Sequence, residues 1–304
     1  MELTDIASDP SVPSIAEFYQ IYQLAVNPWA VAGTTVSFLY DEPTGTAGAV
    51  QRRDGTVLVV FRGTQNRRAG RVDRAHNVMI ALDPVPFAAG QSQKSDAGST
   101  STSGPATRSA EDPPAPPAGP AAHRGFLRKF LSVRSELSDL LDGVRGDRLV
   151  FAGHSAGGAV ATLAFYDHLA AARRRGFRQF AVVELVTFGS PRVLNRHAAD
   201  EVTALVDADP SLRVHRVVNG RDIVPAVPAR FFGYRHVGTE LRIGNRPVWK
   251  LVSGRDHFPG YRLELEQLLR DAGKPDQVDP DPRHWEFWSR APADEATEPP
   301  RQLP

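Results

Sequence analysis

Ser155 stands in the segment Gly-His-Ser-Ala-Gly-Gly at residues 153–158, a setting in which a serine can act as a nucleophile. An apolar run at residues 148–152 precedes it and an alanine- and leucine-rich run follows, which predicts a sharp turn between a strand and a helix. The backbone N–H of Ala156 would face the same space as the serine hydroxyl, where it can stabilise an oxyanion. The bare pattern also arises by chance in loops, so its flanking strand and helix carry the prediction.

A serine nucleophile needs a base and an acid that orients the base. In a strand–turn–helix setting of this kind, the acid and then the base follow the serine along the chain. Asp222 lies just beyond an apolar run at residues 212–218, at the carboxyl end of an expected strand, where open α/β sheets build their active sites. Its alternative interpretation is a residue that merely shapes a turn.

Several histidines could supply the base. His257 comes last in the chain and precedes an expected helix, whereas His236 alternates with apolar neighbours as a strand residue does. His215 falls in an expected core strand and His168 in an expected helix, which favours structural roles. His154 neighbours the nucleophile, but its side chain is expected to point away from the side that the serine takes. The residues alone favour His257, with His236 second.

The elements that must position these residues alternate along the chain. Strands are expected at residues 35–40, 56–61, 148–152, 180–188 and 212–218, and helices at residues 125–141, 156–171 and 197–206. Strands that alternate with helices indicate a largely parallel sheet that is covered on both faces. We therefore predict an α/β fold of the α/β-hydrolase type.

Two stretches depart from the composition of a packed domain. Residues 88–122 consist mainly of Gly, Ser, Thr, Ala and Pro, and such a segment buries too little apolar surface to offset its ordering entropy. Residues 275–304 form a tail rich in proline and acidic residues, and its aromatic residues Trp285, Phe287 and Trp288 either dock on the body or stay loose. A single hydrolase domain is predicted over residues 1–274, interrupted by a disordered insertion at 88–122.

Composition narrows the function classes. The 304 residues are 41% hydrophobic, carry a formal net charge of +1 and include no cysteine. The near-neutral charge argues against a nucleic-acid partner, and the missing cysteines exclude disulfides and thiolate chemistry. No signal peptide and no membrane-spanning run are visible, so a cytoplasmic setting is expected, with export by another route left open.

The chain also resembles the class 3 lipases, the fungal-type lipase family of the α/β-hydrolase fold. Six motifs follow in family order: Val-Val-Phe-Arg-Gly-Thr at 59–64, His-Arg-Gly-Phe at 123–126, Gly-His-Ser-Ala-Gly-Gly-Ala at 153–159, Thr-Phe-Gly-Ser-Pro-Arg-Val at 187–193, Asp-Ile-Val-Pro at 222–225, and Gly-Tyr-Arg-His-Val-Gly at 233–238. Residues 65–85, where the family has its lid, are rich in arginine and lack the tryptophan usual near the start of that lid.

The resemblance implies Ser155, Asp222 and His257 as a catalytic triad. It implies Thr64 as the second residue of the oxyanion hole beside Ala156, and it makes His236 a structural residue.

The function implied is that of a serine carboxylic-ester hydrolase, a lipase that acts on triacylglycerol or another lipid ester through an acyl-enzyme. It would need no metal or organic cofactor. The partners expected are the ester substrate and, transiently, a lipid surface, with no nucleic acid and no obligate protein partner. The alternatives are a short-chain esterase or phospholipase of the same family and, from another class, a catalytically silent hydrolase-fold binding protein.

Overall fold

The computed structural model describes residues 3, 9–28, 35–64, 81–88, 117–220, 222–244 and 254–280. Within these residues, seven strands form a central sheet in the order β1-β2-β3-β6-β7-β9-β11. The strands are β1 (Thr35–Asp41), β2 (Thr46–Arg53), β3 (Thr56–Phe61), β6 (Gly146–His154), β7 (Phe180–Phe188), β9 (Leu212–Asn219) and β11 (Thr239–Ile243). β1, β2 and β3 pair antiparallel, and every later pairing in this sheet is parallel.

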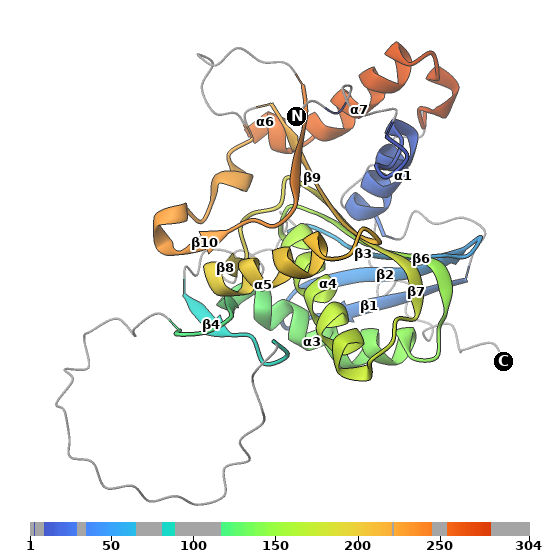
Figure 1. The fold of residues 1–304 in the computed structure, drawn as a ribbon. Coiled ribbons are helices and arrows are strands. Elements are labelled where there is room, and N and C mark those ends of the chain that lie inside the picture. Colours follow the sequence, from blue (N-terminus) through green and yellow to red (C-terminus); the bar gives the residue numbers. More distant parts are fainter. Residues whose placement is uncertain are drawn as a thin grey trace, which may run out of the picture.

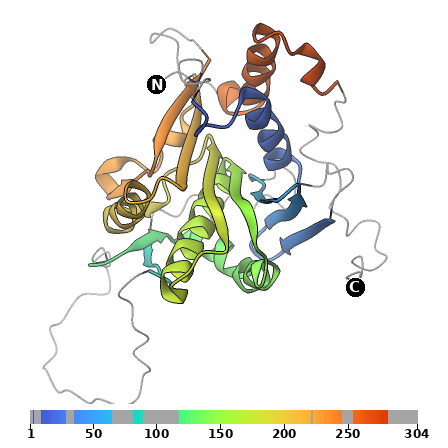
Figure 2. The ribbon, with the colours of Figure 1, turned by 45° about the vertical axis from the view of Figure 1, so that its right-hand side comes forward.

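Helices cover both faces of the sheet (Figures 1 and 2). One face carries α3 (Arg124–Leu141), α4 (Ala156–Arg175) and α5 (Arg196–Asp207), and the other carries α1 (Ile15–Val26) and α7 (Gly260–Asp271). The shorter helices are α6 (Gly254–His257), η2 (Val224–Ala226), η3 (Arg230–Phe232) and η4 (Pro275–Gln277). The predicted α/β-hydrolase architecture is confirmed, and it brings the carboxyl ends of β6, β7 and β9 to one edge.

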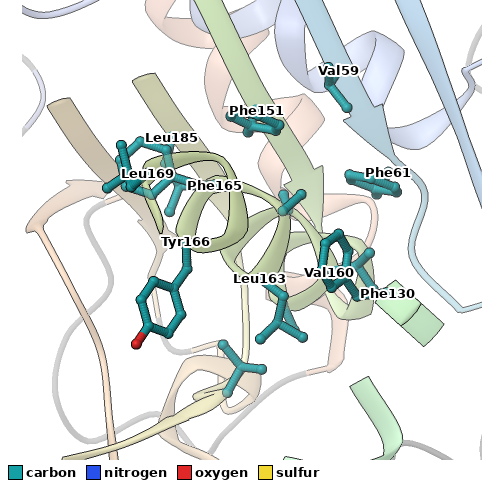
Figure 3. Close-up of a cluster of buried hydrophobic side chains, with 14 of the residues drawn as sticks. Val59, Phe61, Phe130, Phe151, Val160, Leu163, Phe165, Tyr166, Leu169 and Leu185 are labelled. Carbon is teal, nitrogen blue, oxygen red and sulfur yellow. The ribbon is translucent and has the colours of Figure 1, made fainter. Parts of the chain in front are cut away.

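The larger core lies between α4 and the sheet. A helix that is apolar on nearly every side must be buried all round, and α4 has buried residues on every turn from Ala156 to Ala170. Figure 3 shows Phe151 of β6 facing Phe165 of α4, and the two rings meet edge to face with centroids 6.2 Å apart. The hydroxyl of Tyr166 points out of this cluster and donates a hydrogen bond to Glu201 Oε2 at 2.7 Å. This packing fixes the amino end of α4, and with it the turn that holds Ser155.

A second, four-stranded sheet ties together the two ends of the predicted insertion. Its order is β10-β8-β5-β4, with β10 (Tyr234–Arg235), β8 (Leu194–Asn195), β5 (Ala121–His123) and β4 (Leu82–Pro84). β4 and β5 pair antiparallel, so the chain leaves and re-enters the body on neighbouring strands.

The predicted end of the insertion at residue 122 is too late, because Ala121 and Ala122 belong to β5. Ala121 and Ala122 are fully buried in β5, and the backbone N–H of Ala121 donates to Asn195 Oδ1 at 3.0 Å. Residues 89–116 lie outside the described part of the chain.

The start of the predicted tail packs against α1. The backbone N–H of Asp279 donates to the hydroxyl of Tyr19 at 3.0 Å, and the Asp279 carboxylate accepts from Gln23. The tryptophans and phenylalanine predicted as a tail cluster, Trp285, Phe287 and Trp288, lie outside the described residues. In the described part of the chain, none of the helices combines the length and the apolar character needed to cross a membrane.

Candidate active site

Ser155 occupies a strained turn between β6 and α4. Its backbone has φ 56° and ψ −128°, a region that side-chain-bearing residues rarely enter and that costs about 1–3 kcal/mol. A Cβ added to Gly153 would lie 2.3 Å from the carbonyl carbon of Gly157, and one added to Gly157 would lie 2.1 Å from the carbonyl oxygen of Phe61. These two positions of the motif therefore admit only glycine. The Ser155 N–H donates to the Phe188 carbonyl at 2.9 Å, which anchors the turn to β7.

The structure brings the three predicted triad residues together. His257 Nε2 lies 2.8 Å from Ser155 Oγ, and His257 Nδ1 lies 2.8 Å from Asp222 Oδ2. Because the carboxylate accepts at Nδ1, the imidazole presents its Nε2 lone pair to the serine hydroxyl, the arrangement that a general base needs. The Asp222 side chain is fully buried, whereas His257 is partly open to solvent. The residues come from the β6–α4 turn, the end of β9 and α6, which only the folded sheet brings together.

A tyrosine supports the acid, a role that sequence reasoning missed. The Tyr261 hydroxyl donates to Asp222 Oδ2 at 2.9 Å and accepts from the backbone N–H of Asn219 at 3.0 Å. Burial, with the nearby Asp222 carboxylate, raises the pKa of Tyr261 well above its usual range, so the hydroxyl keeps its proton and remains a donor. The other carboxylate oxygen, Oδ1, accepts from the N–H of Val224 at 2.9 Å. Tyr261 lies four residues after His257, and this proximity was the available signal.

A second histidine supports the base. The rings of His154 and His257 stack with centroids 4.7 Å apart and an interplanar angle of 28°. His154 Nε2 lies 3.1 Å from the backbone carbonyl of His257, which can only accept, so Nε2 carries the hydrogen. Burial, followed by the charge of His257, lowers the pKa of His154 well below its usual range and keeps this ring neutral. This supporting role of His154 was not predicted from the sequence.

The short helix α6, which carries the base, is also fixed from the acid side. Asn219, the last residue of β9, donates from Nδ2 to the backbone carbonyl of Asp256 at 3.0 Å. The strand that leads to Asp222 is thereby tied to the residue before His257.

The other histidines considered as the base, His236, His215 and His168, lie elsewhere in the described structure. His236 Nε2 is hydrogen-bonded to the Pro225 carbonyl at 2.8 Å, and burial, with Arg216 as a lesser cause, lowers the pKa of His236 to about 3. It therefore holds the segment after the acid, as the resemblance implied. His215 lies in β9 and His168 in α4, and both are buried as expected.

Of the predicted oxyanion residues, Ala156 directly follows the nucleophile and Thr64 follows a glycine that packs against it. Ala156 is the first residue of α4, so its N–H belongs to the positive end of the helix dipole. Thr64 follows Gly63, whose backbone is so close to the turn that an added Cβ would lie 3.1 Å from Ser155 Cβ. Their role as oxyanion donors stays a prediction, and residues 65–80 of the predicted lid lie outside the described part.

The fold and the site together define an α/β hydrolase with a serine on the turn between a parallel strand and the following helix. A model of the family described as Lipase (class 3) matches residues 58–232, more than half of the chain. The chain therefore belongs to the class 3 lipase family, as its six motifs predict.

The matched relatives are lipases and phospholipases. The secreted mono- and diacylglycerol lipase 1 of Fusarium solani is 36% identical over 137 residues, which is 44% of this chain and 37% of the relative. A secreted mono- and diacylglycerol lipase of Malassezia globosa is 31% identical over 150 residues, 47% of this chain and 46% of the relative. Phospholipase A1-II 3 of Oryza sativa subsp. indica is 28% identical over 270 residues, 82% of this chain and 56% of the relative. The chain thus spans 37–56% of the length of these relatives.

Solved structures share the fold. A fungal lipase–inhibitor complex superposes with a TM-score of 0.56 at 19% identity, covering 83% of this chain and 95% of the lipase. The mono- and diacylglycerol lipase of Aspergillus oryzae superposes with a TM-score of 0.52 at 22% identity, covering 81% of this chain and 85% of that one.

The expectation of a cytoplasmic setting is wrong by this comparison. The relatives from Fusarium solani and Malassezia globosa are both named as secreted lipases. A sequence that shows no visible leader was too weak a basis for that expectation.

Proposed function

We propose that the chain is a serine carboxylic-ester hydrolase that acts on lipid esters. The observation that carries this proposal is the unbroken hydrogen-bonded series from Ser155 Oγ through His257 to the buried Asp222, with both links at 2.8 Å. Membership of the class 3 lipase family supports the same reaction.

The mechanism is acyl transfer in two steps. His257 accepts the hydroxyl proton as Ser155 Oγ attacks the ester carbonyl, and Asp222 stabilises the imidazolium that forms. The backbone N–H groups of Thr64 and Ala156 stabilise the oxyanion, each such donor lowering the barrier by about 2.7–4 kcal/mol. The imidazolium then protonates the departing alcohol and leaves an acyl-serine. Water, deprotonated by His257, attacks this ester, and the acid is released with the serine restored.

For the substrate, we propose glycerolipids. Two of the matched relatives are named as mono- and diacylglycerol lipases, which supports partial acylglycerols as the first choice. A phospholipase A1 matches over 82% of this chain, and this long match supports glycerophospholipids as the second choice.

Turnover of p-nitrophenyl esters of increasing acyl length tests the reaction. We expect Ser155→Ala to abolish turnover and labelling by a fluorophosphonate probe, since Ser155 Oγ is the hydroxyl that lies 2.8 Å from His257 Nε2. Ser135→Ala is the matched control, because Ser135 is exposed on α3, and it should retain full activity. Turnover that persists in Ser155→Ala would refute the assignment. A wild type that neither turns over any ester nor takes the probe would be a silent binding protein.

The natural lipid class can be separated by headgroup. Purified monoacylglycerol, diacylglycerol and diacyl phospholipid are each presented in detergent micelles. If partial acylglycerols are the substrate, the rate of fatty-acid release should fall from monoacylglycerol to diacylglycerol to phospholipid. Faster release from the phospholipid would favour the second choice instead.

A further inference from the structure

The segment between Asp222 and β10 exposes apolar side chains to solvent. The exposed fractions are 44% for Ile223, 45% for Val227, 81% for Phe231 and 45% for Phe232. The two phenylalanine rings lie together, with centroids 4.1 Å apart. Exposed apolar residues are ordinary when they are scattered, but here four fall within ten consecutive residues. We call these four residues the apolar patch.

The apolar patch is held in a defined shape. The N–H of Phe232 donates to the Ala229 carbonyl and that of Gly233 to the Arg230 carbonyl, both at 3.0 Å. Arg192 Nη1 donates to the Pro228 carbonyl at 2.9 Å, and Arg235 Nη1 donates to the Arg230 carbonyl at 2.9 Å. In both views this orange segment beside β10 projects from the body of the molecule (Figures 1 and 2). Its aromatic side chains are therefore presented outward by an ordered backbone.

Three arginines lie on the segment that carries the apolar patch or donate hydrogen bonds to it. Arg192, Arg230 and Arg235 make no ion pair with any carboxylate among the residues that the structure describes. Arg192 and Arg235 both donate to backbone carbonyls of the segment that carries Arg230, and burial, with the charges of Arg230 and its neighbours as lesser causes, lowers the pKa of Arg192. The nearby carboxylate Glu240 is already paired with Arg216 and Arg242. We call Arg192, Arg230 and Arg235 the arginine cluster.

The apolar patch also adjoins the candidate active site. Ile223 directly follows Asp222, and the partly exposed Phe258 directly follows His257. A surface that docks on the patch would therefore lie next to the acid and the base of the triad.

We propose that the apolar patch and the arginine cluster form a docking surface for a lipid bilayer that carries anionic phosphate headgroups. Aromatic side chains favour the boundary between headgroups and acyl chains, and arginine binds phosphate through its fork of N–H donors. Among the described residues these three arginines pair with no carboxylate, which favours this partner over a neutral oil surface, to which apolar contact alone would suffice. The inference rests on the proposed function only in that the docked bilayer would supply the lipid ester to Ser155.

Flotation with extruded vesicles tests the proposal, using full-length Ser155→Ala so that no lipid is consumed. We expect vesicles of phosphatidylcholine mixed with phosphatidylglycerol to bind at least about tenfold more tightly than phosphatidylcholine alone, since each arginine near an anionic surface contributes about fivefold. Arg230→Gln should weaken binding to the anionic vesicles about fivefold, and Arg230→Lys should retain most of it. The double variant Phe231→Ser, Phe232→Ser should lose about tenfold or more, because the inserted apolar area is lost.

The chain offers a matched control at the opposite edge of the sheet. Phe177 is 48% exposed just before β7 begins, and the guanidinium of Arg145 lies 5.3 Å from its ring centroid. Phe177→Ser and Arg145→Gln remove an exposed aromatic and a cation away from the triad, and both should leave vesicle binding unchanged. Thermal unfolding of each variant verifies that the fold is retained.

Several outcomes would overturn the proposal: no vesicle binding, equal binding to both vesicle types, or equal losses in the Phe177 and Phe231 variants. A dimer of the free protein that dissociates in the Phe231→Ser, Phe232→Ser variant would assign the patch to a second copy of the chain instead. Vesicle binding by Ser155→Ala tests the docking surface without turnover, and hydrolysis of soluble esters by the wild type tests the reaction alone. The docking proposal and the proposed function can therefore fail separately.

Discussion

At the scale of single residues, the candidate site depends on groups that never touch the serine. Asp222 Oδ2 accepts from both His257 and Tyr261, so the tyrosine hydroxyl takes up part of the carboxylate's hydrogen-bonding capacity and fixes its orientation. A carboxylate held in this way positions the imidazole before the substrate arrives. Tyr261 is therefore a positioning residue, acting through Asp222.

Removing this hydroxyl gives the first prediction. Tyr261→Phe should lower kcat on p-nitrophenyl esters about tenfold to a hundredfold while KM changes little, because a hydrogen bond to a charged group is worth about 1.5–3 kcal/mol. Tyr19→Phe is the control, since Tyr19 is also buried and hydrogen-bonded but belongs to α1 and contacts the tail. A parallel rise in KM, or an equal loss of kcat in the control, would contradict a positioning role.

At the scale of elements, the turn that holds Ser155 depends on close backbone packing. β3 and the start of α4 approach so closely at Gly157 that its α-hydrogen faces the Phe61 carbonyl. Such contact between backbones cannot relax by a rotamer change, because no flexible side chain is involved.

The second prediction follows from this contact. Gly157→Ala should lower the free energy of unfolding by about 3 kcal/mol or more, measured by urea denaturation, since the methyl group meets backbone atoms. Gly119→Ala should change it little, because an added Cβ at Gly119 meets nothing within 4 Å. Comparable stability of the two variants would show that the turn is more plastic than its geometry indicates.

The sequence predicted most of the central elements because their patterns are local. The expected strand at residues 180–188 matches β7 residue for residue, and the elbow motif located the junction of β6 and α4. β2 was missed because its residues Ala47-Gly48-Ala49 lack the β-branched signature of a strand. Gly48 is required there, since an added Cβ would lie 2.5 Å from the Val60 carbonyl oxygen. α1 was missed although Ser14 and Glu17 stand at capping-box spacing, and Ser14 does cap the helix.

The residues that support the site could not be predicted from local sequence patterns, because they are far from their partners along the chain. Tyr261 is 39 positions from Asp222, and His154 is 103 positions from the carbonyl that it binds. Only the parallel order of β6, β7 and β9 brings these segments to one edge. The grouping of Ser155, Asp222 and His257 was predictable because Ser155 and Asp222 lie in family motifs and His257 follows them in chain order, whereas the supporting contacts require the fold.

At the scale of the whole molecule, the fold buries several histidines in neutral form. Burial lowers the pKa of His123 and of His168 from 6.5 to about 4, and that of His236 to about 3. His123 caps α3, accepting from the N–H of Phe126, His168 lies on α4 and His236 follows β10, so the effect is spread over the whole body. Each of these groups binds its proton more weakly in the folded chain than in the unfolded one.

This difference gives the last prediction, a loss of stability in mild acid. Between pH 6.5 and about 4 the unfolded chain binds more protons than the folded one, so the free energy of unfolding falls as the pH is lowered through that window. Inside the window each buried histidine contributes about 1.4 kcal/mol per pH unit to the slope. Urea midpoints measured from pH 7 to pH 4.5 should fall steeply for the wild type. In His168→Gln the free energy of unfolding should depend less steeply on pH, by the contribution of one buried histidine. An unchanged slope in this variant would mean that His168 has the same pKa in the folded and the unfolded chain.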